Sequence, residues 1–382
     1  MPSITSTHDP KYHLWGLVGI RNGAKSSDEL REHILKCNDK FTRRFGLVIR
    51  DSPMQKVGDL IALELEQMGY ILRKSSGYQL TEKGNNLATD LENNAKAMDA
   101  VIRDFMPTMV STFDDIQIFL KKVLDLEDGI FIPKVPGIFD LRGMKSNDRA
   151  TYLKLCRDYI SSKWNWGSPL QWDDDLLTKK IEYWVKESTS PKPYDIAKAA
   201  YRDYFLSQYF KEELGDVKYK IIRDRLQYFG LVNYSEHLSE FDGEIMYPLI
   251  WNKQKVPYAK PMTLLGNAFY SSNPSWKDIS AEFLSTLWQT HKSLPGAGFV
   301  PVMDLRDKVC FILRISDMSF DNLLKRARIE GQRGKTKIRI YADPSDLSAR
   351  ETSKKRMPID FGADTGMGVR TLISLSVYEQ KS

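Results

Sequence analysis

The stretch LELEQMGYILRKSSGYQLTEKG, Leu63–Gly84, decides the fold of the N-terminal part of the chain. Two short, mostly apolar runs, Tyr70–Leu72 and Tyr78–Leu80, flank the polar segment Arg73–Gly77, which is typical of a β-hairpin with a small turn. Thr81 is suited to cap a helix after the second strand. Before the hairpin, apolar residues recur with helical spacing at Val57, Leu60, Ile61 and Leu65. The stretch therefore predicts helix, hairpin and helix in direct succession.

Upstream residues extend this pattern to helix, helix, hairpin, helix. Ser27–Leu30 opens a first helix that continues through Cys37, and Asp51–Pro53 opens the second, because proline suits the first helical position. After the hairpin, Asn85–Phe105 is predicted to be one connecting helix.

Composition is compatible with a folded protein and with an anionic partner. The chain has 382 residues, of which 42% are hydrophobic, and 56 basic residues stand against 50 acidic ones, for a net charge of +6. Three cysteines, Cys37, Cys156 and Cys310, lie far apart, which argues against a disulfide framework or a cysteine-rich zinc site. No signal peptide and no apolar run of membrane-spanning length is recognisable. We expect a soluble, cytoplasmic protein without a membrane segment.

The middle of the chain has weaker patterns. Phe113–Leu124 is helical in period, and GIFIPKVPGIF, 129–139, predicts an edge strand or a loop because two prolines interrupt it. Arg149–Ile160 is again helical. The tryptophan-rich segment 164–172 is interpreted as a packing corner, and Glu187–Asp195 as a linker.

The opening pattern returns twice. The second copy has predicted helices Asp195–Phe210 and Val217–Phe229, followed by the strand-like runs LVNY and IMYPLIW. The third has a helix around Phe283–Trp288, a strand FVPVMD, a helix Ser319–Ile329, a GQRGK turn and the strand KIRIYAD. The remaining tail contains SARETSKKR and DFGADTGMG, and both stretches are predicted to be loop-like.

Two helices followed directly by a hairpin resemble the winged-helix fold. The likeness is best in Leu63–Gly84, whose LTEKG close is similar to that of bacterial and archaeal winged-helix regulators. We therefore expect a mainly α fold with small β-hairpins (α+β), built of tandem winged-helix-like domains joined by helical segments. The predicted divisions are 13–105, 106–190 (helical or irregular), 191–258, 259–348 and a basic, glycine-rich tail, 349–382.

The resemblance implies that the second helix of a module lies in the major groove of double-stranded DNA and that the hairpin tip reaches a phosphate or the minor groove. Cations on a short turn or a helix face suit this contact without reference to any family. The predicted DNA-binding residues are Lys56, Arg73, Lys74, Ser75, Lys218, Lys220, Arg223, Arg225, Gln227, Lys325, Arg326, Arg328, Arg333 and Lys335.

The helix Lys218–Gln227 is expected to be the main contact. Its apolar face would hold Tyr219, Ile222, Leu226 and Phe229, which leaves the exposed faces to its four cations. In the first module, by contrast, three acids would oppose a close approach to phosphates: Asp59, Glu64 and Glu66.

The sequence contains short matches to enzyme motifs, but each lacks the residue spacing or the neighbouring sequence that the motif requires. GQRGKT, 331–336, has two residues between its glycines and a strand after its lysine, whereas a phosphate loop needs four residues and a helix. DFG, 360–362, lacks the other kinase motifs, and the five histidines are scattered. Asp173–Asp175 is interpreted as the acidic start of a helix and not as a metal site. We predict no catalytic residue, no metal and no cofactor.

The sequence thus favours a non-catalytic, double-stranded-DNA-binding adaptor with protein partners in a multi-subunit complex. Chains of this kind resemble accessory subunits of prokaryotic antiviral defence or DNA-processing systems. Three alternatives stay open: a winged-helix transcriptional regulator, a nuclease subunit whose active site hides in 113–187, and a subunit that binds only protein.

Overall fold

The computed structural model describes residues 3–7, 9–45, 56–93, 96–126, 129–133, 151, 154, 173–187, 193–211, 215–236, 238, 243–295, 298–343, 358–362 and 368–377. The tryptophan-rich segment 164–172, residues 188–192 of the predicted linker and the helix start at 51–53 lie outside these residues, as does most of the helix predicted at 149–160.

From α2 onward, the N-terminal unit has the order of elements that its sequence predicts, whereas helix α1 was not predicted. Its elements are α1 (Lys11–Arg21), α2 (Ser27–Phe45), α3 (Val57–Gln67), β1 (Ile71–Lys74), β2 (Gly77–Leu80) and α4 (Glu82–Glu92). Strands β1 and β2 pair antiparallel, with Lys74 opposite Gly77. Gly77 has a φ of +108°, which a side chain would strain, and the Thr81 hydroxyl caps α4 by accepting from the Gly84 amide at 3.1 Å.

The prediction of a single connecting helix over Asn85–Phe105 is wrong. Helix α4 ends at Glu92, and the path continues as α5 (Ala97–Ala100), a π-helical turn (Val101–Phe105), α6 (Met106–Thr112) and α7 (Asp114–Asp125). Asn93 takes an extended conformation at the break. Asparagine favours such positions because its side chain competes with the backbone for helical hydrogen bonds.

The following elements surround a small sheet. They are β3 (Ile130–Pro133), α9 (Asp174–Glu187), α10 (Pro193–Phe210), α11 (Asp216–Tyr228), β4 (Val232–Ser235) and β5 (Gly243–Pro248). The sheet order is β3-β5-β4, so β3 is an edge strand, as its prolines predict. An Asp173 carboxylate oxygen accepts from the Leu176 amide at 2.9 Å, which confirms that the acidic run opens α9.

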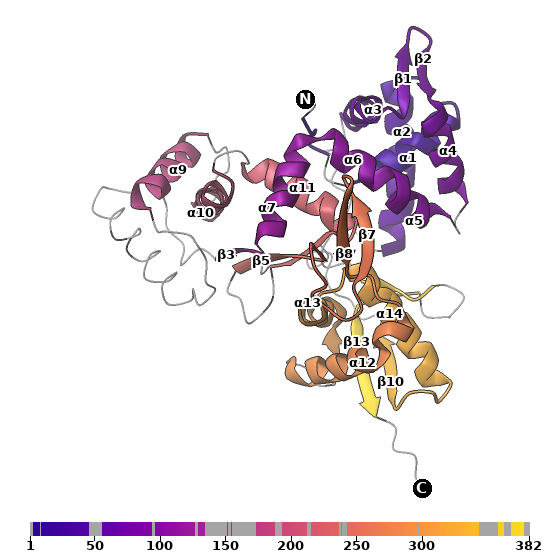
Figure 1. Cartoon of the computed structure of the whole chain (residues 1–382), viewed down its shortest axis with the longest axis vertical. Coiled ribbons are helices and arrows are strands. Elements are labelled where there is room, and N and C mark those ends of the chain that lie inside the picture. The colour runs from indigo at the N-terminus through magenta and orange to yellow at the C-terminus, as the bar shows by residue number, and fades with distance from the viewer. Residues whose placement is uncertain are drawn as a thin grey trace.

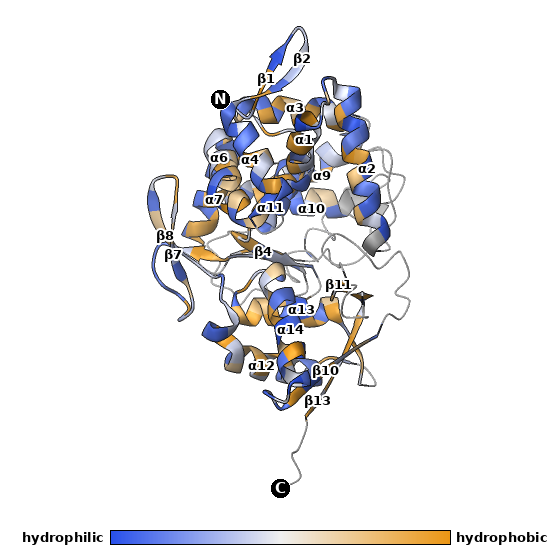
Figure 2. Cartoon of the chain, turned by 90° about the vertical axis from the view of Figure 1, so that its right-hand side faces the viewer, coloured by the Kyte–Doolittle hydropathy of each residue, from blue (hydrophilic) through white to orange (hydrophobic). Residues whose placement is uncertain are grey.

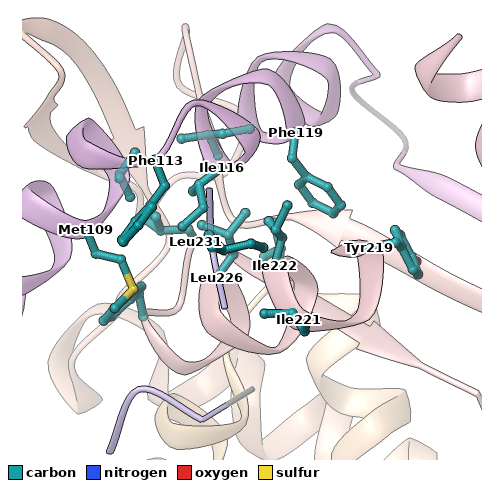
Figure 3. Packing of buried hydrophobic residues seen from close by; sticks show 14 of the residues in the cluster. Met109, Phe113, Ile116, Phe119, Tyr219, Ile221, Ile222, Leu226 and Leu231 are labelled. Atoms are coloured by element: carbon teal, nitrogen blue, oxygen red, sulfur yellow. The ribbon is translucent and has the colours of Figure 1, made fainter. Parts of the chain in front are cut away.

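One hydrophobic cluster extends from Ile4 to Phe269; it draws mainly on the first three predicted domains and also includes Leu264 and Phe269 of the fourth. Helix α11 lies at its centre, with Ile222 and Leu226 facing Met109, Phe113 and Ile116 from α6, α7 and the residue between them (Figure 3). The N-terminal, middle and second segments therefore share one core, while the exact domain boundaries stay predictions.

In the residues that the structure describes, the C-terminal part contains three small antiparallel sheets. Its elements are β6 (Ile250–Trp251), β7 (Lys260–Leu264), β8 (Asn267–Ser271), α12 (Trp276–Ser293), β9 (Val300–Pro301), α13 (Val302–Leu313), α14 (Asp317–Gln332), β10 (Ile338–Asp343), β11 (Ile359–Asp360), β12 (Val369–Arg370) and β13 (Leu372–Val377). The sheet orders are β6-β8-β7, β10-β13-β9 and β11-β12.

One expectation for this part is wrong. FVPVMD is extended only at Val300 and Pro301, because α13 begins at Val302 and buries Leu305 and Val309 with helical spacing. The tail also supplies strands that its sequence did not predict, β11, β12 and β13, which except for Asp360 lie outside the two stretches predicted to be loop-like. Strand β13 is the middle strand of its sheet and turns Ile373 and Leu375 inward.

The chain is elongated, with the β1–β2 hairpin at one end and the unit of α12–α14, β10 and β13 at the other (Figure 1). The tip of the hairpin is hydrophilic (Figure 2). Within the described residues, no helix is long and apolar enough to cross a membrane.

Candidate nucleic-acid interface

The β1–β2 hairpin presents its predicted contacts at the surface. Arg73, Lys74 and Ser75 are exposed, and Lys56 is exposed just before α3. Arg73 already has an acidic partner, because its Nε lies 2.9 Å from a carboxylate oxygen of Glu66. Both cations belong to strand β1 and only the serines form the turn, so the hairpin places its charge beside the tip.

Helix α11 does not present its arginines to solvent. Arg223 is 5% exposed and Arg225 is fully buried. The expectation that α11 is a basic, DNA-facing helix is therefore wrong at its two central residues. Tyr219, Ile222 and Leu226 are buried as predicted, but most of the remaining circumference is covered as well.

Arg225 joins α11 to the N-terminal unit. Its Nη2 lies 2.9 Å from Oε1 of Glu64 on α3, and its Nε and Nη2 donate to the Thr7 carbonyl oxygen at 3.1 and 2.8 Å. The other Glu64 oxygen lies 2.7 Å from Nε2 of His13. Glu64 is thus buried too, and the acid expected to repel DNA instead neutralises the cation expected to bind it.

The contacts among Glu64, Arg225 and His13 shift the pKa values of the buried Glu64 and His13 side chains. Burial alone raises the pKa of Glu64, but the charge of Arg225 and the hydrogen bond with His13 lower it by more, so the net shift is downward. Burial lowers the pKa of His13, against the opposing effect of Glu64. The geometry is that of a structural ion pair shielded from water.

Arg223 belongs to a second buried group, around Glu244 of β5. Glu244 accepts from Arg223, from Nη2 of Arg202 at 2.9 Å and from the Tyr219 hydroxyl at 2.9 Å. Burial raises the pKa of Glu244, but Arg223 and Arg202 outweigh it and make the net shift downward. Moving Arg223 out to a phosphate would leave this carboxylate short of a partner.

The other predicted contacts of α11 are also engaged within the chain. Lys218 Nζ lies 3.0 Å from Asp115, and Lys220 Nζ lies 2.5 Å from Asp216. The Gln227 amide donates to Asn233 and, at 3.1 Å, to Asp317 at the start of α14. Helix α11 is therefore a central packing element that ties the N-terminal and C-terminal parts together.

The predicted residues of α14 lie closer to the surface. Arg326 is about half-exposed and pairs with the buried Glu330, and Lys335 is exposed with its Nζ 3.6 Å from the same acid. Arg333 is exposed and has no ion pair within the described residues. Lys325 and Arg328 are half-buried along the helix.

Sequence reasoning missed three basic residues beside them. Lys337 and Arg339 are exposed at β10, and Arg370 is half-buried at the end of β12. The signal for the first two was present, because KIRIYAD alternates polar and apolar residues and so predicts a strand with one basic face. Arg370 had no such signal, because β12 is two residues long.

We name the resulting area the α14–β10 basic surface, which consists of Lys325, Arg326, Arg333, Lys335, Lys337 and Arg339. The acids at the N-terminal end of α14 are engaged elsewhere: Asp317 accepts from Asn233 at 3.0 Å and Asp321 lies 2.8 Å from Arg306. Positive charge is therefore concentrated on the C-terminal half of α14, the following turn and β10.

A cavity of about 840 Å³ lies between α1, α2, α11 and α14. Its wall combines the rings of Trp15, Phe41 and Tyr228 with lysines and with several aspartates. Because these aspartates offset the lysines, the cavity is not a strongly basic channel. Among the described residues, no group of three or more His, Cys, Asp and Glu side chains is arranged to hold a metal ion.

No family model and no curated protein matches the chain. Among solved structures it is similar to one titled as restriction endonuclease FokI, with 12% sequence identity and a TM-score of 0.27 over 85% of this chain and 60% of that chain. Another, titled as FokI bound to DNA, has 13% identity and a TM-score of 0.21 over 76% of this chain and 44% of that chain. The chain thus spans less than two thirds of the length of either, and at these TM-scores the likeness carries no inference about function.

Proposed function

We propose that the chain binds double-stranded DNA through the α14–β10 basic surface and acts as a DNA-binding adaptor without a catalytic step of its own. The observation that carries the proposal is the exposure of Arg333, Lys335 and Lys337 on one short turn after a helix. Exposed cations on a rigid support neutralise phosphates and release counterions, which is the main source of affinity for DNA.

The order of elements in this unit supports the same proposal. Helices α12, α13 and α14 are followed by β10 and β13 of a sheet whose third strand, β9, lies between α12 and α13, and β13 pairs with both β10 and β9. We propose that this unit and the N-terminal unit are winged-helix-like modules, in which the helix before the hairpin or sheet approaches a groove of the duplex. The two units need not contact DNA equally.

The β1–β2 hairpin is proposed to be the weaker contact. Arg73 must leave Glu66 to reach a phosphate, whereas Arg333 has no carboxylate to leave within the described residues. The hairpin and the α14–β10 basic surface also lie at opposite ends of the molecule (Figure 1). A short duplex would therefore contact one of them at a time.

A salt titration with a labelled duplex tests the main contact. If about six phosphates are neutralised, log K falls with log salt at a slope of about −5 for the wild-type chain. The variant Arg333→Gln/Lys335→Gln/Lys337→Gln should lower the affinity and reduce the slope by about one for each lost phosphate contact.

The matched control is Lys121→Gln/Lys179→Gln/Lys186→Gln, which removes the same charge from exposed positions on α7 and α9. It should keep nearly the wild-type slope. Equal losses in both triple variants would show a nonspecific effect of net charge, and no binding by the wild-type chain at low salt would reject DNA as the partner. The Arg73→Gln/Lys74→Gln variant should lose less than the Arg333/Lys335/Lys337 variant.

The non-catalytic part of the proposal has its own test. Plasmid and single-stranded DNA incubated with the chain and Mg²⁺ or Mn²⁺ should stay intact, since a nuclease needs converging carboxylates around a metal. Cleavage by the purified chain would reject the adaptor role and leave the DNA-binding proposal standing.

A further inference from the structure

Arg328 and Arg370 approach one another from different elements beside the α14–β10 basic surface. The guanidinium carbon of Arg328, on α14, lies 5.6 Å from the ring centroid of Phe361. Phe361 is 6% exposed and donates its amide to the Gly368 carbonyl oxygen at 2.9 Å, which closes the β11–β12 hairpin. Arg370 belongs to this hairpin and lies opposite Ile359 in the strand register.

Neither arginine has an acidic partner within the described residues. Nη1 of Arg370 donates to the Val369 carbonyl oxygen at 2.9 Å, while its Nε is buried without a hydrogen-bond partner. Among the described residues, the carboxylates nearest along the chain are engaged: Glu330 pairs with Arg326 and Lys335, and Asp360 accepts from the Gly362 amide. A buried N–H without an acceptor is uncommon and costs stability.

The electrostatics of this pair differ from those of the buried arginines elsewhere. Burial lowers the pKa of Arg328, and the charge of Arg370 lowers it further. By contrast, neighbouring carboxylates outweigh burial and raise the pKa of Arg223 and Arg306. Two like charges that are partly removed from water repel one another unless an anion lies between them.

We propose that Arg328 and Arg370 form a binding site for a phosphate-type oxyanion, and that a backbone phosphate of DNA occupies it. Guanidinium groups hold phosphates through paired, charge-assisted N–H···O bonds, and two of them from different elements can bind two oxygens of one phosphate. The site itself rests on the arginines, and only the source of the phosphate rests on the proposed function. It adds Arg370 to the interface.

Inorganic phosphate tests the site without DNA. The wild-type chain should melt at a higher temperature in phosphate than in chloride of equal ionic strength, and the rise should grow with phosphate concentration. Arg370→Gln and Arg328→Gln should each abolish most of this rise, while Arg370→Lys should keep part of it because the charge remains. Arg103→Gln, at an exposed position in the π-helical turn Val101–Phe105, should keep the phosphate effect of the wild type.

Binding to a DNA duplex tests whether the phosphate in this site comes from the DNA backbone. The double variant Arg328→Gln/Arg370→Gln should reduce the salt slope by about one, as expected for one lost phosphate contact, with an unchanged far-UV spectrum and a melting temperature in chloride no lower than that of the wild type. A lost phosphate effect with unchanged duplex binding would overturn the assignment to DNA.

Two further outcomes separate this inference from the proposed function. If the wild-type chain binds the duplex but neither the phosphate effect nor the slope depends on the two arginines, the oxyanion site is overturned and the proposed function stands. If the wild-type chain binds no DNA but shows the arginine-dependent phosphate effect, the proposed function fails and the oxyanion site stands.

Discussion

Replacing Arg225 by methionine should destabilise the whole N-terminal core. Methionine keeps much of the length of the side chain but removes the charge and its donors. The change deprives the Thr7 carbonyl oxygen of two donors and Glu64 of its cation, although the Thr5 amide and His13 still contact the carboxylate. Because Arg225 and Glu64 are both fully buried, water cannot take over these contacts.

The expected cost is about 3–5 kcal/mol, the range for removing one partner of a buried ion pair. Urea denaturation at 25 °C, followed by far-UV circular dichroism, measures this free energy. Arg333→Met is the matched control: it removes the same group from an exposed position and should change stability by less than about 0.5 kcal/mol.

The pH dependence of the free energy of unfolding provides a second test of the Arg225–Glu64 pair. In the wild-type chain the pKa of Glu64 is lower in the folded than in the unfolded state, so its contribution to stability is present above the unfolded pKa and is lost as the pH falls. In Arg225→Met the burial remains without the cation, so the folded pKa rises and protonation relieves the buried charge. The difference between wild type and variant should therefore shrink as the pH falls from about 7 to about 4.

A double variant separates the pair from the individual residues. Arg225→Met/Glu64→Leu should be more stable than the sum of the two single changes, since no unpaired charge remains buried. The reasoning is refuted if Arg225→Met costs less than about 1 kcal/mol at pH 7, or if the two single costs simply add.

Two further substitutions test local contacts in the N-terminal unit. Gly58→Ala should cost several kcal/mol in urea denaturation, because the added Cβ would lie 2.1 Å from the Ser27 carbonyl oxygen and force α3 away from α2; a variant as stable as wild type would contradict this close approach. Thr81→Ala should cost about 1 kcal/mol through loss of the α4 cap, with Thr81→Ser as the control that keeps the hydroxyl, and equal losses in both would exclude capping as the cause.

Elements that short-range chemistry determines could be predicted from the sequence. Thr81 caps α4 and Asp173 opens α9 through hydrogen bonds to amides three residues ahead. Gly77 supports the turn of the β1–β2 hairpin, and β3 is an edge strand as its prolines predict. Each of these signals lies within a few residues of the structure that it determines.

The surface of α11 could not be predicted in the same way. Helical spacing correctly placed Tyr219 and Ile222 inside, but an arginine is expected outside unless it has a buried partner. The partner of Arg225 is Glu64, 161 residues earlier, and no local pattern announces a pairing over that separation. The α14–β10 basic surface was partly predicted because its cations are close in sequence.

The place of β13 in its sheet has a consequence for how the chain is made. Strands β9 and β10 hydrogen-bond to β13 and not to one another, so both leave the ribosome before their common partner is synthesised. Until residue 377 has emerged, Val300 and Ile340 lack the strand against which they are buried in the finished fold. A nascent chain paused before Leu372 would therefore display unpaired strand edges and apolar side chains, the features that chaperones bind and that promote aggregation.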